Sequence, residues 1–121
     1  MMDKELSQAF TIQEEDTARA VGSGTLDVLA TPRLISWMEY VARLLCQGEE
    51  AGSDTSVGIE IHMKHLAPSA VGSEITVTAS LSDTHKSIRT YKVEAHMGDK
   101  LVAEGEHKRA IVNQDEFMKQ L

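Results

Sequence analysis

The chain has 121 residues, a length that suits one compact domain spanning 1–121, and 41% of them are hydrophobic, which is enough for a core. The formal net charge is −7 and no Lys/Arg cluster occurs, so neither nucleic acid nor an anionic membrane surface is an expected partner. The N-terminus has no apolar signal segment, no stretch is long enough to span a bilayer, and Cys46 is the single cysteine; together these features predict a cytoplasmic protein.

The first thirty residues predict short extended segments. Residues 1–8 are polar and are expected to fray. Short strands are predicted at 10–13 and 17–21, on either side of an acidic turn. A Gly-Ser-Gly break at 22–24 follows, and residues 25–30 form an extended entry to the next element.

One long helix is predicted to begin at Thr31. Threonine is a favourable N-cap residue, and Pro32 suits the first helical position. Apolar residues recur at helical spacing along one face, at Leu34, Ile35, Met38, Val41, Ala42 and Leu45. Trp37 and Leu44 widen this apolar surface, so we expect the helix to be wrapped by a sheet or shared with a partner. The helix is expected to end by Gly48.

Alternation of apolar and polar residues predicts four strands after the helix, at about 56–65, 74–82, 88–97 and 101–112. In the first, one face is expected to carry Val57, Ile59, Ile61, Met63 and His65. A polar turn is expected at 83–87, and Gly98-Asp99 signals a hairpin loop. Residues 113–121 are expected to form a short, partly helical tail.

A strand, a long helix and four strands in hairpin succession predict an α+β fold, in which an antiparallel sheet packs on one central helix. One helix covers only part of such a sheet. Its remaining edge or surface is a natural place for two copies to meet, so a homodimer is expected.

Thr31, Glu39 and His65 supply a hydroxyl, a carboxylate and an imidazole, the groups used in acyl transfer or thioester hydrolysis. His65 ends its strand, where the alternative is a hydrogen-bonded histidine at the rim of the core. Glu39 lies in the middle of the helix, where the alternative is a solvated carboxylate paired with Arg43. The Thr31 hydroxyl is expected to cap the helix, beside free N–H groups that would favour an oxyanion.

The other polar candidates have simpler interpretations. Gly58, inside a strand and on the face opposite His65, indicates a bulge or a close backbone approach. Cys46 is expected to be a buried, inert thiol. The remaining histidines lack metal-ligand spacing and are expected at the surface, so no metal is predicted; they are His62, His85, His96 and His107. Nucleotide-binding motifs are absent, so no cofactor is expected beyond a CoA carried by the substrate.

Three segments, 22–42, 55–81 and 103–112, together resemble the fluoroacetyl-CoA thioesterase-like branch of the hotdog thioesterases. The resemblance is carried by the ATP at the helix start, the glutamate eight residues later, a Val-Gly pair, the HLAP sequence and a closing GxHxRxxV pattern. It covers roughly residues 15–113.

This resemblance implies a hotdog fold, hydrolysis of an acyl-CoA substrate, and a homodimer with active sites at or near the subunit interface. It implies that Thr31, Glu39 and His65 are the catalytic set. It also implies that Gly58 lies near the acyl group and that Arg109 contributes to substrate binding, with a structural ion pair as the alternative for Arg109.

Two other functions on the same fold stay open. An enoyl-thioester hydratase would use an Asp/His pair, for which Asp27 and His65 are available. A non-catalytic acyl-CoA-binding protein would not need all three polar groups. Residues 22–30 contain none of the phenylalanines that shield the acyl group in the fluoroacetyl-specific enzyme, so weak selectivity for fluoroacetyl-CoA is expected.

Overall fold

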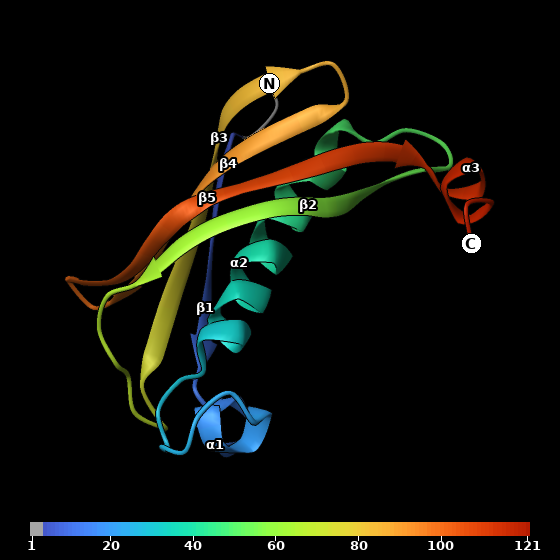
Figure 1. Cartoon of the computed structure of the whole chain (residues 1–121). Helices are drawn as coiled ribbons and strands as arrows, with labels where there is room; N and C mark the ends of the chain where they lie inside the picture. Colours follow the sequence, from blue (N-terminus) through green and yellow to red (C-terminus); the bar gives the residue numbers. More distant parts are fainter. Residues whose placement is uncertain (1–3) are drawn as a thin grey trace.

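The computed structural model describes residues 4–121 and contains one curved sheet, one long helix and several short helical segments (Figure 1). In chain order the elements are β1 (Glu5–Thr11), the 3-10 turn η1 (Glu14–Asp16), α1 (Ala18–Val21), α2 (Thr31–Cys46), the 3-10 turn η2 (Gln47–Glu49), β2 (Asp54–His65), β3 (Glu74–His85), β4 (Ile88–Met97), β5 (Lys100–Asn113) and α3 (Gln114–Met118).

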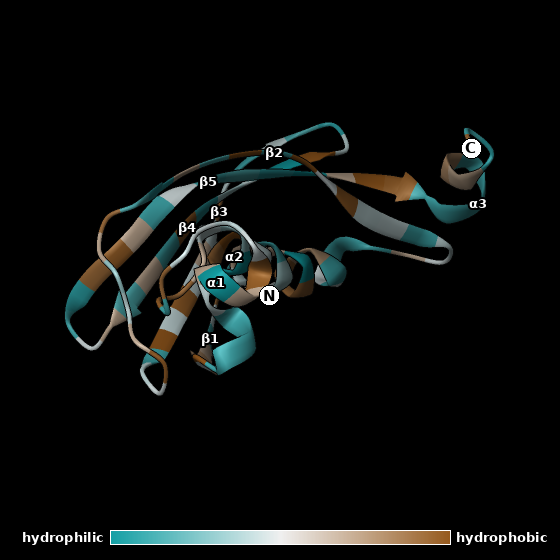
Figure 2. Cartoon of the chain, turned by 60° about the horizontal axis from the view of Figure 1, so that its bottom comes forward, coloured by the Kyte–Doolittle hydropathy of each residue, from teal (hydrophilic) through white to brown (hydrophobic). Residues whose placement is uncertain are grey.

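The five strands form one antiparallel sheet in the order β1-β3-β4-β5-β2. The sheet curves around α2, which lies on its concave side (Figure 2). The predicted α+β architecture is therefore confirmed. The predicted succession of hairpins is wrong at one step: β2 pairs with β5 and not with β3, so the chain crosses the sheet between β2 and β3. This crossing leaves β1 and β2 as the two edge strands.

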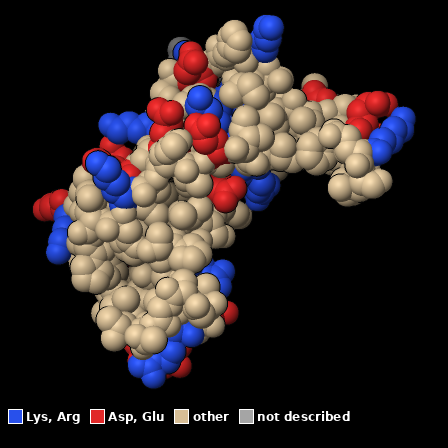
Figure 3. Space-filling model, viewed as in Figure 1, with Lys and Arg blue, Asp and Glu red and all other residues tan. Residues whose placement is uncertain are grey.

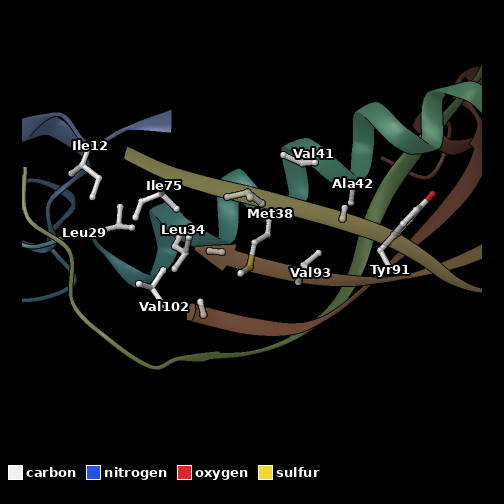
Figure 4. Packing of buried hydrophobic residues seen from close by; sticks show 14 of the residues in the cluster. Ile12, Leu29, Leu34, Met38, Val41, Ala42, Ile75, Tyr91, Val93 and Val102 are labelled. Atoms are coloured by element: carbon white, nitrogen blue, oxygen red, sulfur yellow. The ribbon is translucent and has the colours of Figure 1, made fainter. Parts of the chain in front are cut away.

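The core lies between one face of α2 and the middle of the sheet (Figure 4). Helical spacing places the buried α2 side chains on one stripe, made of Leu34, Met38, Val41, Ala42 and Cys46. They pack against alternate residues of β3 and β4, including Ile75, Val77, Ala79, Tyr91, Val93 and Ala95. Trp37 extends this contact to the edge strand β1, because its ring stacks on Phe10 with 4.7 Å between ring centroids.

The N-terminal predictions need correction. Residues 5–8 belong to β1, which pairs with β3, so they do not fray; residues 1–3 lie outside the described part of the chain. The predicted strand at 17–21 is the short helix α1. Thr17 caps this helix by accepting a hydrogen bond from the Ala20 amide, and Gly22, at φ +88°, ends it in the left-handed conformation. These local cap bonds outweigh the extended preference of an isolated five-residue segment.

A β-bulge changes the predicted faces of β2. The pairing with β5 skips one residue between Gly58 and Glu60, so Ile59 is the extra residue and 51% of its surface is exposed. Because of this shift, Gly58 faces the helix side together with Met63 and His65, although strict alternation would place it opposite them. The prediction that Ile59 shares a face with His65 is wrong.

The predictions for the β3–β4 turn, the β4–β5 hairpin and the C-terminal tail agree more closely with the structure. β3 continues to His85, so the predicted 83–87 turn is tighter, with Lys86 at φ +56°. The Gly98-Asp99 hairpin joins β4 to β5. The C-terminal tail contains the short helix α3, at the far end of the arm formed by β2 and β5 (Figure 1). Over residues 4–121, no helix combines the length and apolar character needed to cross a membrane.

Candidate active site

Thr31 and His65 meet at the start of α2. The end of β2 carries His65 over the first turn of the helix, and the Thr31 Oγ1 atom lies 2.8 Å from His65 Nδ1. Ala30 occupies the N-cap position, and no side chain caps this helix. The predicted capping role of Thr31 is therefore wrong: Thr31 is the first helical residue, and its hydroxyl is committed to the imidazole instead.

The surroundings of His65 favour a neutral imidazole. Burial lowers the pKa of His65 below the ordinary value for histidine, and a hydrogen bond with the Ala67 backbone offsets part of this effect. The Nε2 atom is buried and has no hydrogen-bond partner among residues 4–121. The ring thus presents a proton acceptor at neutral pH.

A surface cavity of about 330 Å³ opens at the Thr31–His65 pair. Its walls are small or aliphatic and come from α1, the segment before α2 and the chain after β2; they include Ala18, Ser23, Val28, Leu29, Leu66, Ala67 and Pro68. No aromatic side chain lines it. The absence of an aromatic residue in 22–30 is therefore not compensated by one from another part of this wall.

Glu39 lies farther along α2 and faces β5. Its Oε2 atom lies 3.8 Å from the Arg109 Nη1 atom, and 42% of the Glu39 side chain is exposed. The alternative partner, Arg43, instead places its guanidinium 5.2 Å from the centre of the Tyr40 ring. Glu39 is thus a carboxylate with one face against a buried cation and the other open to the surface.

Arg109 is held rigidly beneath this carboxylate. Its side chain is 6% exposed, and its Nε and Nη2 atoms donate to the Ser56 hydroxyl and carbonyl at 2.9 and 3.1 Å. Burial lowers the pKa of Arg109 and the facing Glu39 carboxylate opposes that shift, so the guanidinium stays charged at neutral pH. This placement favours the ion pair that the sequence left open as the alternative role for Arg109.

His107 is the residue that sequence reasoning missed. It is 1% exposed, whereas a surface position was expected. Its Nδ1 atom lies 2.9 Å from the Glu60 carbonyl oxygen and its Nε2 atom 3.2 Å from Arg109 Nη1. The alternation of residues along β5 could have predicted this buried position, because charged residues at 104, 106 and 108 point outward and His107 shares the inner face with Arg109.

Gly58 lies against the Glu39 carboxylate. A Cβ atom at this position would stand 2.6 Å from Glu39 Oε2 and 3.2 Å from His107 Cε1. Both interpretations of this glycine, a bulge and a close approach, are confirmed. Glu39, Gly58, Ile61 and His107 line a second surface cavity of about 330 Å³.

The candidate site residues of one chain therefore form two separate polar clusters, Thr31 with His65 and Glu39 with Arg109 and His107. Thr31 and Glu39 are eight residues apart on one helix, which separates them by about 12 Å along its axis.

Asp27, the acid of the hydratase alternative, pairs with Arg19 at 3.0 Å and is 64% exposed. Among residues 4–121, no group of three His, Cys, Asp or Glu side chains could hold a metal ion, and Cys46 is buried.

Comparison with known proteins identifies the family. The model of the fluoroacetyl-CoA-specific thioesterases matches residues 12–115. The chain belongs to this family. A fluoroacetyl-CoA thioesterase from Streptantibioticus cattleyicolor is 30% identical over 92 residues, which cover 75% of this chain and 66% of that protein, slightly less than two thirds of its length.

Solved structures agree on the fold. A structure of the fluoroacetyl-CoA thioesterase FlK superposes with a TM-score of 0.92 at 22% identity, covering 99% of this chain and 93% of that one. A hot-dog-like protein from Thermanaerovibrio acidaminovorans gives 0.88 at 19% identity, covering 96% and 86%. The sheet wrapped around α2 is thus the hotdog fold.

Proposed function

We propose that this protein hydrolyses the thioester of a small or medium acyl-CoA to a carboxylate and CoA, with Thr31, Glu39 and His65 as the catalytic residues. The observation that carries this proposal is the 2.8 Å contact of Thr31 Oγ1 with His65 Nδ1 beside a small apolar-walled cavity. Such a cavity suits an acyl group. The hydroxyl and the first amides of α2 would orient and polarise the thioester carbonyl.

We further propose that the working unit is a homodimer. A single chain separates Glu39 from Thr31 by about 12 Å along the helix, too far for both to act on one carbonyl. β2 is an edge strand, and its bulge exposes Ile59. Antiparallel pairing of two β2 strands would carry the His65 end of one copy toward the Gly58 region of the other.

The shape and charge of the molecule support this pairing. In Figure 3 the arm of β2 and β5 overhangs the α2 side, and few charged side chains lie over the start of α2. A second copy could fit under the arm and cover this surface of low charge. One active site would then combine Glu39 of one copy with Thr31 and His65 of the other.

In the proposed reaction the Glu39 carboxylate activates the attack on the thioester carbonyl. In one route it positions a water molecule; neutral His65 takes the proton released on attack and passes it to the departing sulfur as the C–S bond breaks. In the other route Glu39 itself attacks, the thiolate leaves, and water then hydrolyses the mixed anhydride. A single turnover in oxygen-18 water separates them, because only hydrolysis at the glutamyl carbonyl of the anhydride puts the label into Glu39.

The deciding experiment is a free-thiol assay with short, medium, aryl and halogenated acyl-CoA substrates. We expect thiol release by the wild type and a loss of about 10²–10⁴-fold in Glu39→Gln and in His65→Ala. Glu106→Gln, an exposed carboxylate on β5, is the matched control and should keep wild-type turnover. Turnover at the wild-type rate in Glu39→Gln or His65→Ala would remove that residue from the mechanism.

The same assay separates the alternatives. Loss of the crotonyl-CoA absorbance without thiol release would indicate a hydratase, and acyl-CoA binding without any turnover would indicate a binding protein. The proposed cytoplasmic location is supported by the free, buried Cys46, which suits a reducing compartment.

A further inference from the structure

Beneath Glu39, the partners of the buried His107 ring define its protonation state. The Glu60 carbonyl only accepts hydrogen bonds, so His107 Nδ1 at 2.9 Å must carry the proton and donate. The Arg109 guanidinium only donates, so His107 Nε2 at 3.2 Å must accept. Both ring nitrogens are satisfied in one state only, the neutral tautomer protonated at Nδ1.

His107 faces only a few charged groups. Arg109 is its neighbour on β5, and Glu39 approaches from α2; the Glu60 backbone contacts it from β2. Burial lowers the pKa of His107, the Glu60 hydrogen bond opposes that effect, and Arg109 adds to it. A proton on Nε2 would break the bond to Arg109 and place two cations side by side in a buried site.

The Arg109 guanidinium is therefore held by hydrogen bonds on two sides. Ser56 accepts from its Nε and Nη2 atoms, and His107 accepts from the Nη1 atom that also lies 3.8 Å from Glu39 Oε2. Among residues 4–121, Ser56 makes no hydrogen bond to Nη1, and His107 is the acceptor for this nitrogen nearest the carboxylate, while Ser56 holds the rest of the planar guanidinium. A change in His107 would reach Glu39 through Arg109.

We propose that His107 is a positioning residue of the thioesterase site: as a neutral imidazole protonated at Nδ1, it fixes the Arg109 guanidinium against Glu39. This inference rests on the proposed function of Glu39. His107 lines the same cavity as Glu39 and accepts a hydrogen bond from the Arg109 nitrogen that faces the carboxylate, so its removal changes the rate of the chemical step more than substrate binding.

Two substitutions separate the roles of the two ring nitrogens. His107→Asn keeps a donor near Nδ1 and loses the acceptor for Arg109, whereas His107→Gln keeps an acceptor near Nε2. We expect kcat to fall about tenfold or more in His107→Asn, with KM within about twofold, and His107→Gln to recover most of kcat. A purely structural role would instead lower the stability of both variants without this difference in kcat, and equal kcat values in the two would overturn the proposal.

A double-mutant cycle tests whether the effect of His107 on the rate passes through Glu39. In a Glu39→Gln background, His107→Asn should leave the residual rate unchanged within about twofold, because the group that it positions is already lost. A further loss as large as in the wild type would mean that His107 acts independently of Glu39, which contradicts the proposal.

A readout without turnover keeps the inference separate from the proposed function. Nitrogen-15 NMR at pH 7 should show His107 as a neutral ring protonated at Nδ1, and resolved Nη–H signals for Arg109 that collapse in His107→Asn and persist in His107→Gln. If no acyl-CoA releases thiol but these signals behave as expected, the proposed function fails and the positioning contact stands. Protonation at Nε2, or unchanged Arg109 signals in His107→Asn, would overturn the inference itself.

Discussion

Thr31 and His65 are 34 residues apart in the chain, yet Thr31 Oγ1 lies 2.8 Å from His65 Nδ1. The contact forms because β2 ends directly over the first turn of α2. It links the start of α2, the one long helix among residues 4–121, to the end of an edge strand. The hydroxyl therefore belongs to a polar pair at the mouth of a cavity, while the helix starts without a side-chain cap.

The first prediction concerns this pair. Thr31→Ala should lower kcat about fivefold, because it removes one hydrogen bond from the imidazole, and such a bond contributes about 1 kcal/mol. Thr31→Ser keeps the hydroxyl and should retain most of the activity. Thr31→Ser should melt close to the wild type, and Thr31→Ala should lose no more than the hydrogen bond with His65, since Ala30 occupies the N-cap position. A loss of stability in Thr31→Ala that persists in a His65→Ala background, where this bond is already absent, would restore the capping interpretation.

The second prediction concerns the close approach at Gly58. In Gly58→Ala the new methyl group would meet Glu39 Oε2 at 2.6 Å, so the carboxylate must move from its present position. We expect kcat to fall at least tenfold while the protein remains folded, because the displaced atom is the far end of a flexible side chain. Gly48→Ala is the matched control, since nothing lies within 4 Å of a Cβ there. Full activity of Gly58→Ala would show that the position of Glu39 is not critical.

The third prediction is the pH dependence of stability. His65 and His107 both have lowered pKa values, chiefly because of burial. Below pH about 6.5 the unfolded chain binds protons on these residues that the folded chain does not, so the free energy of unfolding should fall as the pH drops from about 7 to about 5. Above that range this contribution is fully present.

Urea unfolding at pH 7, 6 and 5 measures this slope. His107→Gln removes one of the two groups and should make the decline shallower. His85→Gln, which replaces an exposed histidine near the β3–β4 turn, is the control for the loss of any imidazole, and His107→Gln should change the slope more than it does. The linkage argument is wrong if His107→Gln and His85→Gln give the same slope as the wild type.

The fourth prediction concerns the acyl group. The cavity at Thr31 and His65 is lined by small and aliphatic side chains, with no aromatic residue to close over a short acyl chain. One methylene or fluorine contact changes the transition-state energy by about 1–3 kcal/mol even in a close-fitting pocket. We therefore expect weak discrimination between fluoroacetyl-CoA and acetyl-CoA, and a higher kcat/KM for a larger acyl group. A fluoroacetyl preference of several orders of magnitude would contradict this expectation.

The sequence alone determined the elements and the chemistry they could carry. Helical spacing from Leu34 to Leu45 and the alternation of the later strands are local patterns, set by which side chains must leave water, so α2 and the α+β architecture followed from them. The motifs around Thr31, Glu39 and His65, together with the closing GxHxRxxV pattern, resemble the family that the comparisons confirmed.

Only the tertiary structure decided how these residues meet. The bulge at Ile59 turns Gly58 toward Glu39, and a bulge depends on the partner strand rather than on the local pattern. β2 pairs with β5 at the edge of the sheet and ends where His65 contacts Thr31. The alternation of β5 places His107 on the inner face, but its burial depends on the packing of β5 between β4 and β2, because a buried polar ring requires hydrogen-bond partners, here Arg109 on its own strand and the distant Glu60 carbonyl on β2.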